Sequence, residues 1–384
     1  MTDLAPGDAR ALTRTLVRID SRNPSLAPGA PGEGAVAQAL AAVMRDWGAR
    51  VELVESSPGR PCVVARFGTG GGRSLMFNGH LDTVGVDGMV HAPWDAAERE
   101  GRLRGRGSCD MKAGVAAMCA AAARAAARGL AGEVVVAAVT DEEFESAGTR
   151  TLLSRGVRAE AAIVTEPTRL AICPAHRGFA WIEVTVHGRA AHGSRYDLGT
   201  DAIRGAALVM AELDAIEERE LTERRHPLLG HASLHAATVE GGIGWSTYPD
   251  RCVLRLERRT LPGETPAEAV REAEDACARV RARRPAFRTE ARLVFAQSPS
   301  DVAVDAPVVQ ALRASLVARG EAVRLEGMSA WTDAALLNDA GIPAICFGPG
   351  DIALAHAAEE YVPLAEVDRA TAVLEELVGR WFGA

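Results

Sequence analysis

Four short apolar segments of this sequence each lead into acidic residues or a histidine. His80 and Asp82 follow segment 75–77, and Asp141-Glu142-Glu143 follows segment 133–140. Glu166 follows segment 161–165, and segment 342–348 leads into Gly348-Pro349-Gly350 and then His356. Short apolar runs of this kind are typical of buried strands. Because ligand sites in open α/β sheets form at the carboxyl ends of the strands, the pattern predicts one polar site at one edge of a sheet.

Strands alternate with amphipathic helical segments over most of the chain, which is typical of a sheet covered by helices on both faces. The pattern changes near residue 180, where residues 181–187 alternate apolar and polar side chains with a period of two. The 384 residues also exceed the length at which one core stops growing. We therefore expect an α/β fold with a mixed, mostly parallel sheet over 1–179 and 297–384, and an inserted smaller α+β domain over 180–296.

Composition argues against a nucleic acid or a membrane as the partner. Lys and Arg number 43 against 51 Asp and Glu, a formal net charge of -8 with interspersed signs, so no basic face is expected. The seven cysteines form no Cys-x-x-Cys pair, which favours reduced thiols and a cytoplasmic location. The N-terminal segment lacks the apolar core of a signal peptide, and the Ala-rich segment 111–131 contains three basic residues, so no membrane span is expected.

The predicted site combines two histidines with several carboxylates. Asp110 joins them because it directly precedes the Ala-rich segment 111–129, which predicts a helix on propensity. Imidazole and carboxylate are ligands that suit zinc, manganese or cobalt. Carboxylates gathered at one place repel each other unless cations neutralise them, so a pair of metal ions is predicted.

Each element also has an ordinary structural interpretation. An Asp before a helix is commonly an N-cap, and an acidic pair such as Glu142-Glu143 is common at a solvated helix start. These interpretations do not explain why such residues recur at one end of four apolar strands. The pair His231-x-x-x-His235 lacks an adjoining Glu and lies in a strand-like segment, so it is interpreted as structural. The same interpretation is given to His91, His176, His187 and His226.

A series of motifs runs through nearly the whole chain. In order they are NGHLDTV, GRGSCDMKAG, TDEEFESAG, TEPT, HGRAAHGS, VEGG, RTLPG and GPGDIALAH. The series resembles the acetylornithine deacetylase and succinyl-diaminopimelate desuccinylase family of two-metal amidohydrolases, which also includes aminoacylases, carboxypeptidases and dipeptidases. The resemblance implies a zinc-peptidase-like catalytic domain, and a smaller domain at 180–296 that acts as lid and dimer contact.

The resemblance also implies a complete set of metal ligands. Asp110 is expected to bridge two divalent ions, which are expected to be zinc, with cobalt or manganese as alternatives. His80 and Glu166 are expected to bind one ion, and Glu143 and His356 the other.

Four further residues receive roles from the resemblance. Asp82 is expected to hold the His80 ring in one tautomer, and Glu142 to act as the general base. His192 matches a histidine that donates to the negative oxygen of the tetrahedral intermediate, often from the partner subunit. Arg259 matches an arginine that receives a substrate carboxylate, and its alternative interpretation is a solvated strand arginine.

Three functions remain open at this stage. The first is hydrolysis of the amide bond of an N-acyl amino acid by a metal-bridged hydroxide, with a glutamate as general base. The second is a carboxypeptidase or dipeptidase on the same scaffold, and the third is a catalytically silent binding protein. Trp245 and Trp331 lie where many relatives carry an Asn or a Gly-rich segment, which suggests a less polar substrate than ornithine or diaminopimelate. A homodimer is expected, with the strand at 181–187 pairing across its two-fold axis.

Overall fold

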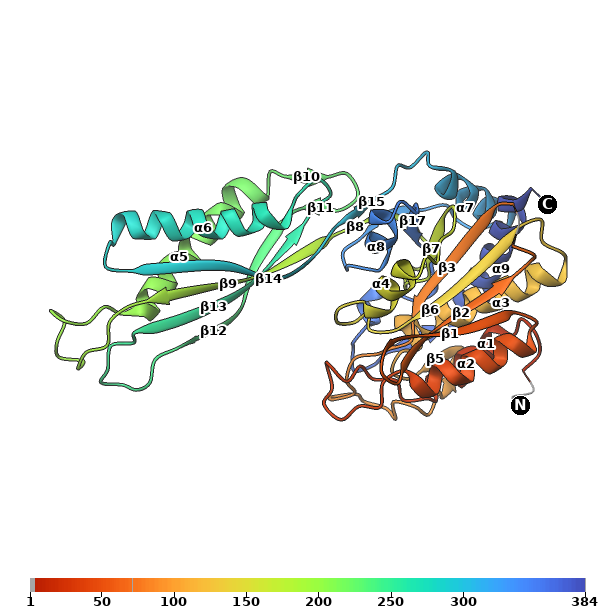
Figure 1. Ribbon diagram of the computed structural model, residues 1–384, viewed down its shortest axis with the longest axis horizontal. Helices are drawn as coiled ribbons and strands as arrows, with labels where there is room; N and C mark the ends of the chain where they lie inside the picture. The colour runs from red at the N-terminus through yellow and green to blue at the C-terminus, as the bar shows by residue number, and fades with distance from the viewer. Residues whose placement is uncertain (1–3, 71, 384) are drawn as a thin grey trace. The chain divides into compact units, whose positions relative to one another are not determined.

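The computed structural model describes residues 4–70 and 72–383 and divides into two compact units (Figure 1). The first unit comprises Met1–Pro174, Val302–Met328 and Thr332–Ala384. The second comprises Ala175–Asp301 together with Ser329–Trp331. None of the described helices combines the length and the apolar character needed to cross a membrane.

The first unit is built on a mixed sheet whose four central strands are parallel. Its strand order is β1 (Arg50–Ser57), β2 (Arg60–Phe67), β6 (Glu133–Val139), β3 (Ser74–His80), β7 (Ala162–Val164), β17 (Ala344–Cys346) and β8 (Ile172–His176), with β16 (Leu325–Met328) beside β8. The neighbours from β6 to β17 pair in parallel, whereas β1 is antiparallel to β2, β2 to β6 and β8 to β17. The α/β fold class is confirmed, and the parallel pairing lies in the four central strands.

These four central strands are the apolar segments from which the site was predicted. Because they are parallel, their carboxyl ends lie at the same edge of the sheet. His80 ends β3, whereas Asp141 and Glu166 lie two residues beyond the ends of β6 and β7. The topology therefore places the predicted side chains together, as the sequence pattern required.

Helices cover both faces of this sheet. Leu75 and Phe77 of β3 belong to the large core, which also includes residues of α1 (Ala9–Val17), α2 (Gly34–Asp46), α3 (Ala113–Ala127), α7 (Pro307–Ala318) and α9 (Leu364–Phe382). The next side chain along β3, Asn78, donates to Thr149 Oγ1 of α4 (Ala147–Ser154) at 3.2 Å. Since alternate residues of a strand point to opposite faces, α4 lies on the other face, where it contacts α8 (Ala334–Asp339).

Helix α3 is alanine-rich because it is buried on nearly every side. It packs between the sheet and the helices α1 and α9, and small side chains allow this close approach. Gly114 in its first turn lies so near β7 that a Cβ atom there would come within 1.9 Å of the Thr165 backbone oxygen. The absence of a side chain at this one position brings the segment that carries Asp110 against the end of β7.

A small three-stranded sheet lies beside this helix start. It has the order β18 (Tyr361–Pro363), β5 (Arg102–Arg104) and β4 (Glu98–Arg99). The turn η1 (Ser108–Lys112) connects the loop after β5 to α3 and contains Asp110, whose peptide bond to Met111 is cis. The short helix η3 (Ile352–Leu354) precedes His356.

The second unit is an antiparallel sheet with helices on one face. Its strand order is β12 (Ser233–Gly241), β13 (Arg251–Thr260), β9 (Gly178–His187) and β14 (Arg288–Gln297). Ile182, Val184 and Val186 of β9 pack in a core with α5 (Ala202–Ile216) and α6 (Pro266–Arg283). The unit also contains η2 (Glu217–Leu221), the pair β10 (Arg225–His226) and β11 (Gly230–His231), and β15 (Ser300–Asp301), which pairs with the last two residues of β8.

The prediction that the strand at 181–187 pairs across a two-fold axis is wrong. Strand β9 is hydrogen-bonded to β13 on one side and to β14 on the other along its length, so its backbone is not available to a second chain. Its period-two pattern arises because one sheet face is covered by helices and the other is not. The edge strands are β12 and β14, and residues 235–241 of β12 are exposed.

Candidate metal centre

His80, Asp110 and Glu166 form the first group of possible metal ligands. One ligand atom from each lies within 4.8 Å of the others, and all three residues are buried. The Nε2 atom of His80 is 3.1 Å from Asp110 Oδ1 and 3.9 Å from Glu166 Oε1. One imidazole nitrogen and two carboxylates that converge at this distance can hold a divalent ion.

Asp110, Glu143 and His356 form the second group, again with ligand atoms within 4.8 Å of one another. The Nε2 atom of His356 is 3.0 Å from Glu143 Oε2 and 3.4 Å from Asp110 Oδ2. Asp110 therefore belongs to both groups, through Oδ1 toward His80 and through Oδ2 toward His356. A carboxylate placed in this way can bridge two ions.

Electrostatics favours cations at this place. Burial raises the pKa of Glu142 and Glu166 well above the usual range of a glutamate. Burial acts in the same direction on Asp110, but hydrogen bonds from His356 and His80 hold its pKa below the usual range. The hydrogen bonds to Asp110 and Glu143 raise the pKa of His356 to about 10. The carboxylates thus require nearby positive charge, which two divalent ions would supply.

These observations fit a pair of divalent metal ions. The donors are imidazole nitrogens and carboxylate oxygens, a set suited to borderline and hard cations. Among the residues described, two histidines offset the negative charge of the buried Asp110 and Glu166 and of the partly buried Glu143. Neither His231 nor His235 belongs to a group of possible ligands among the residues described.

Asp82 contacts the His80 ring through its backbone. The Nδ1 atom of His80 donates to the backbone oxygen of Asp82 at 2.9 Å, whereas the Asp82 carboxylate is 3.7 Å away. This main-chain bond keeps the hydrogen on Nδ1 and leaves Nε2 free to bind a metal ion. The predicted tautomer control is therefore carried by the carbonyl of Asp82 and not by its side chain.

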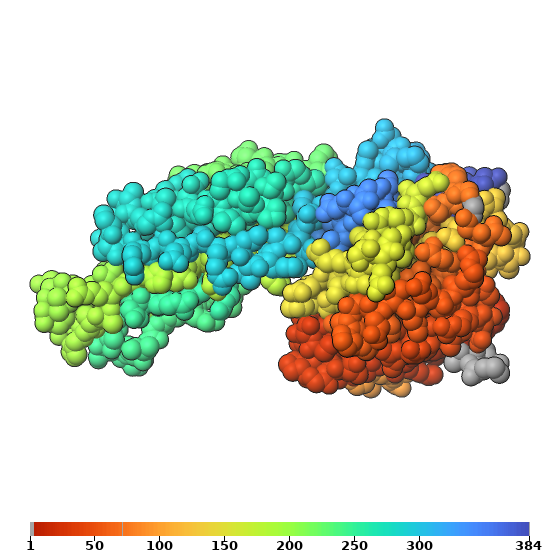
Figure 2. Space-filling model, in the orientation of Figure 1, coloured from red at the N-terminus to blue at the C-terminus, as the bar shows by residue number. Residues whose placement is uncertain are grey.

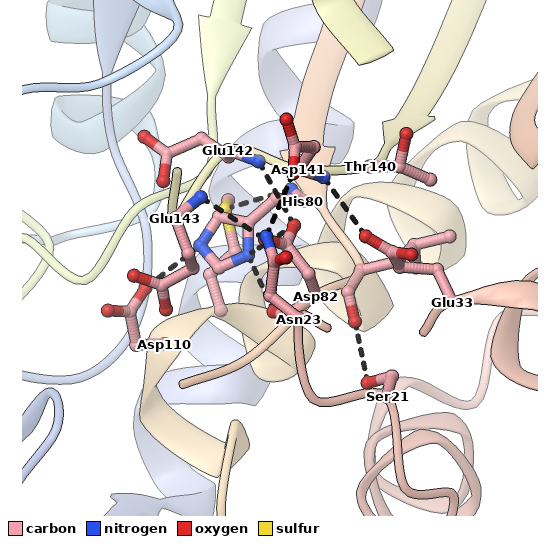
Figure 3. Close-up of polar contacts among 12 residues, drawn as sticks. Ser21, Asn23, Glu33, His80, Asp82, Asp110, Thr140, Asp141, Glu142 and Glu143 are labelled. Carbon is pink, nitrogen blue, oxygen red and sulfur yellow. Dashed lines mark hydrogen bonds and ion pairs between the residues drawn. The ribbon is translucent and has the colours of Figure 1, made fainter. Parts of the chain in front are cut away.

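The carboxylate of Asp82 instead orients the acidic pair. It accepts hydrogen bonds from the backbone N–H groups of Glu142 and Glu143 at 3.1 and 3.2 Å. It also accepts one from Asn23 Nδ2 at 2.9 Å (Figure 3). Bonds from a single buried carboxylate to two consecutive amides fix the turn that follows β6.

Further buried side chains support this turn, and sequence reasoning did not identify them. Asn23 also donates to Asp141 Oδ1 at 3.0 Å, and Arg60 Nη1 donates to the same oxygen at 3.0 Å. Arg60 in turn forms a two-pronged pair with the fully buried Glu33, which also accepts from the Asp141 backbone N–H. Asp141 itself has a positive φ of 67°, unusual for a residue other than glycine. The network holds the turn in this conformation.

Glu142 and Glu143 differ in their contacts although they are neighbours. The Glu143 carboxylate contacts His356 at 3.0 Å. Among the residues that the structure describes, none forms a hydrogen bond or ion pair with the Glu142 carboxylate. A partly buried carboxylate that is unpaired beside two groups of possible metal ligands is well suited to accept a proton.

His192 and Arg259 lie in the second unit. The ring of His192 is exposed, and its Nδ1 atom is 2.9 Å from Ser194 Oγ. Arg259 donates to Glu257 at 2.6 Å, and its guanidinium lies 5.4 Å from the centre of the Phe179 ring. These contacts leave the roles predicted for both residues as hypotheses.

The two tryptophans also lie in the second unit. Trp331 donates to the backbone oxygen of Ser298 at 2.9 Å and packs edge-on against Phe179. Trp245 is fully exposed. Their predicted contact with substrate is therefore also a hypothesis.

Comparison with known proteins places this geometry in a family. The profile of "Peptidase family M20/M25/M40" matches residues 76–380. The chain belongs to this family. It is 32% identical over 327 residues to acetylornithine deacetylase of Myxococcus xanthus, covering 84% of each chain. It is also 32% identical to N-acetyl-L-citrulline deacetylase of Xanthomonas campestris, over 96% of each.

Solved structures of the M20 family share the fold. An M20 family metallo-carboxypeptidase from Sulfolobus solfataricus superposes with a TM-score of 0.81 at 17% identity, over 98% of this chain and 100% of the other. A dinuclear metal-binding M20 peptidase of Bacillus subtilis gives a TM-score of 0.75 at 16% identity, over 98% of each chain. The chain is thus a metallohydrolase of the M20 family, and the ligand groups around Asp110 provide places for two divalent ions.

Proposed function

We propose that this M20 protein is a deacylase that hydrolyses the amide bond of an N-acyl amino acid. The observation that carries the proposal is that Asp110 is shared by two ligand groups, with the unpaired carboxylate of Glu142 beside them. Its relatives at 32% identity are named as deacetylases of amino acids, which supports an acyl amino acid as the substrate.

The metal ligands and Glu142 have different roles in the proposed hydrolysis of the amide. Bound divalent ions would polarise the substrate carbonyl and make a water molecule more acidic. Glu142 accepts the proton of the attacking water on its carboxylate and passes it to the nitrogen of the leaving amine. Burial, which raises the pKa of Glu142, brings that carboxylate closer to the proton affinity needed for both transfers.

Two residues of the second unit complete the proposed site. His192 donates an N–H to the negative oxygen of the tetrahedral intermediate. Arg259 receives the free carboxylate of the substrate, for which its planar guanidinium is suited. In this proposal the domain at 180–296 acts as a lid and as the dimer contact. The tryptophans at 245 and 331 favour a less polar substrate than ornithine or diaminopimelate.

Zinc is the proposed metal, with cobalt and manganese as alternatives. Each ligand group contains one histidine and two carboxylates, a combination that zinc binds readily in hydrolases. We also propose a cytoplasmic location, supported by seven free, buried cysteines, since reduced thiols are typical of that compartment. Fractionation of cells would contradict the location if the protein appeared outside the cytoplasm.

The function is tested by free-amine release from a panel of N-acetyl, N-succinyl and N-formyl amino acids and dipeptides. The chelator-treated protein is assayed alone and with zinc, cobalt or manganese added. We expect turnover of a subset of the acyl amino acids, dependent on the added ion. Preferential cleavage of the dipeptides would instead support the carboxypeptidase or dipeptidase function. A metal-loaded, folded protein that cleaves nothing would support the silent binding protein.

We further propose that His192 acts across a homodimer. The loop that carries it is hydrogen-bonded to the turn after β12, through Gly193 N to Ser246 O and Tyr248 N to Ala191 O. In Figure 2 the loops near residues 190–200 and 241–249 adjoin at one end of the second unit. The exposed edge strand β12 and the exposed Trp245 are features that a second copy would cover.

Mixing two inactive variants tests this arrangement. A mixed dimer of His192→Ala and Glu142→Gln contains one site with both native residues if His192 acts in trans. After subunit exchange, about a quarter of the wild-type activity should return, because half of the dimers are mixed and each has one intact site. Native mass spectrometry confirms the exchange. Mixed dimers that remain inactive, or a protein that is monomeric throughout, would contradict the proposal.

A further inference from the structure

Glu360 is a buried carboxylate next to the metal centre but outside the predicted ligand set. It lies one residue before β18 and is fully buried. Its oxygen Oε1 accepts from the backbone N–H groups of Cys109 and Asp110 at 2.9 and 3.1 Å. Its oxygen Oε2 accepts from the backbone N–H of Gly107 at 3.0 Å and from Arg106 Nη1 at 2.7 Å. Three backbone amides of the segment that delivers Asp110 thus converge on one side chain.

This arrangement is fully satisfied and electrically balanced. Each oxygen of Glu360 has two donors, and the charge is paired with Arg106, whose side chain is also buried. A buried carboxylate is tolerated when it is paired and hydrogen-bonded in this way. Arg106 is itself fixed by a bond from Nε to the backbone oxygen of Gly85 at 2.8 Å.

Glu360 also belongs to the segment that carries His356. The backbone oxygen of Glu360 accepts from Gly105 N at 3.3 Å and from His91 Nε2 at 3.2 Å. The backbone oxygen of Ala358 accepts from Val90 N at 3.1 Å. The segment after η3 is therefore tied to the loops that precede Asp110, and Glu360 makes most of these bonds.

The two ligand groups depend on this segment to different degrees. His80 and Glu166 lie at or directly after the parallel strands β3 and β7, which hold them independently of Glu360. His356 lies on a loop with a positive φ of 59°, and its side chain is 53% exposed. Its ring forms hydrogen bonds or ion pairs with Glu143 and Asp110 alone among the residues described. The position of His356 relative to Asp110 thus depends on the bonds that Glu360 makes.

We propose that Glu360 is a positioning residue that fixes Asp110 and His356 relative to each other, and so sets the affinity of the ion held by Asp110, Glu143 and His356. This inference rests on the proposed two-metal function. Glu360 touches neither ion in this proposal and acts through the backbone of residues 107–110. Because Asp110 is shared, removing the charge of Glu360 should weaken the binding of both ions, but that of the ion held by Asp110, Glu143 and His356 more than that of the ion held by Asp110, His80 and Glu166.

The test is a titration of chelator-treated Glu360→Gln with Zn²⁺, followed by calorimetry. In either orientation of the new amide, its NH₂ group faces a backbone N–H, so at least one of the convergent bonds is lost. We expect two ions on the wild type. On the variant we expect an affinity roughly 10- to 100-fold weaker for one ion, and a smaller loss for the other ion, which keeps His80 and Glu166. Glu360→Asp keeps the charge but shortens the reach, and should give a smaller loss at the same ion.

Glu272→Gln is the matched control. Glu272 is also buried and paired with arginines, at 2.9 Å to Arg258 and 2.6 Å to Arg224, but it lies in the second unit. The Glu272→Gln variant should bind both ions with wild-type affinity even if its melting temperature falls. The inference would be overturned if Glu360→Gln bound each ion as tightly as the wild type does. It would also be overturned if the variant lost the same factor of affinity for both ions. Fewer than two ions on the wild type would overturn the two-metal function itself.

Discussion

Replacing Glu142 with Gln should lower kcat by roughly 10²- to 10⁴-fold, the contribution typical of a general base. The amide has the shape of the carboxylate but cannot accept a proton. The bond from the Glu142 backbone N–H to Asp82 does not involve the side chain, so the fold of the turn is kept. Steady-state kinetics on the best substrate of the panel, with ion content measured in parallel, gives the result.

Glu145→Gln is the control for this change. Glu145 lies three residues along the same turn and is exposed, so its replacement should leave kcat close to that of the wild type. A Glu142→Gln variant that binds both ions and retains kcat within a few fold would show that another group carries the proton. Loss of the ions along with activity would assign Glu142 to the ligand set instead.

Replacing Asp110 with Asn should lower the affinity for both ions by more than about 100-fold. This is a larger loss than is typical when a residue that supports a ligand is removed. The reason is that its two oxygens point to different groups, Oδ1 to His80 and Oδ2 to His356. An amide offers one oxygen and places an NH₂ group where the other oxygen was. Activity should fall to background, and the ion content after dialysis should approach zero.

Glu143→Gln gives the informative contrast. Glu143 belongs to one ligand group only, so this variant should lose one ion and keep the other. Ion content by mass spectrometry distinguishes the two variants. If Asp110→Asn retained one ion at wild-type affinity, Asp110 would not be shared between the two groups.

Much of the metal centre could be predicted because each ligand strand is a short apolar run that ends in a polar residue. The runs that became β3, β6, β7 and β17 are parallel neighbours, so their carboxyl ends coincide in space. The α/β fold could be predicted because apolar strand segments alternate with amphipathic helical segments along the chain. Asp110 could be found because the Ala-rich segment that forms α3 begins a few residues after it, at Ala113.

The supporting residues could not be predicted in this way. Asn23, Arg60 and Glu360 act through contacts between segments that are distant in the sequence, and no periodic pattern marks such contacts. The atom through which Asp82 holds the His80 ring could not be predicted, because the bond is made by a backbone carbonyl, which every residue has. The position of β9 inside its sheet was missed because a period of two reveals which face is covered and not which strands lie beside it.

The most direct test of this account is an anomalous difference map from a zinc-loaded crystal, recorded on both sides of the zinc absorption edge. We expect two peaks, one at each oxygen of Asp110. One should lie at coordinating distance from His80 and Glu166, and the other from Glu143 and His356, about 2.0 to 2.2 Å from their nitrogen and oxygen atoms. A single peak, or two peaks that do not share Asp110, would contradict the two-metal centre.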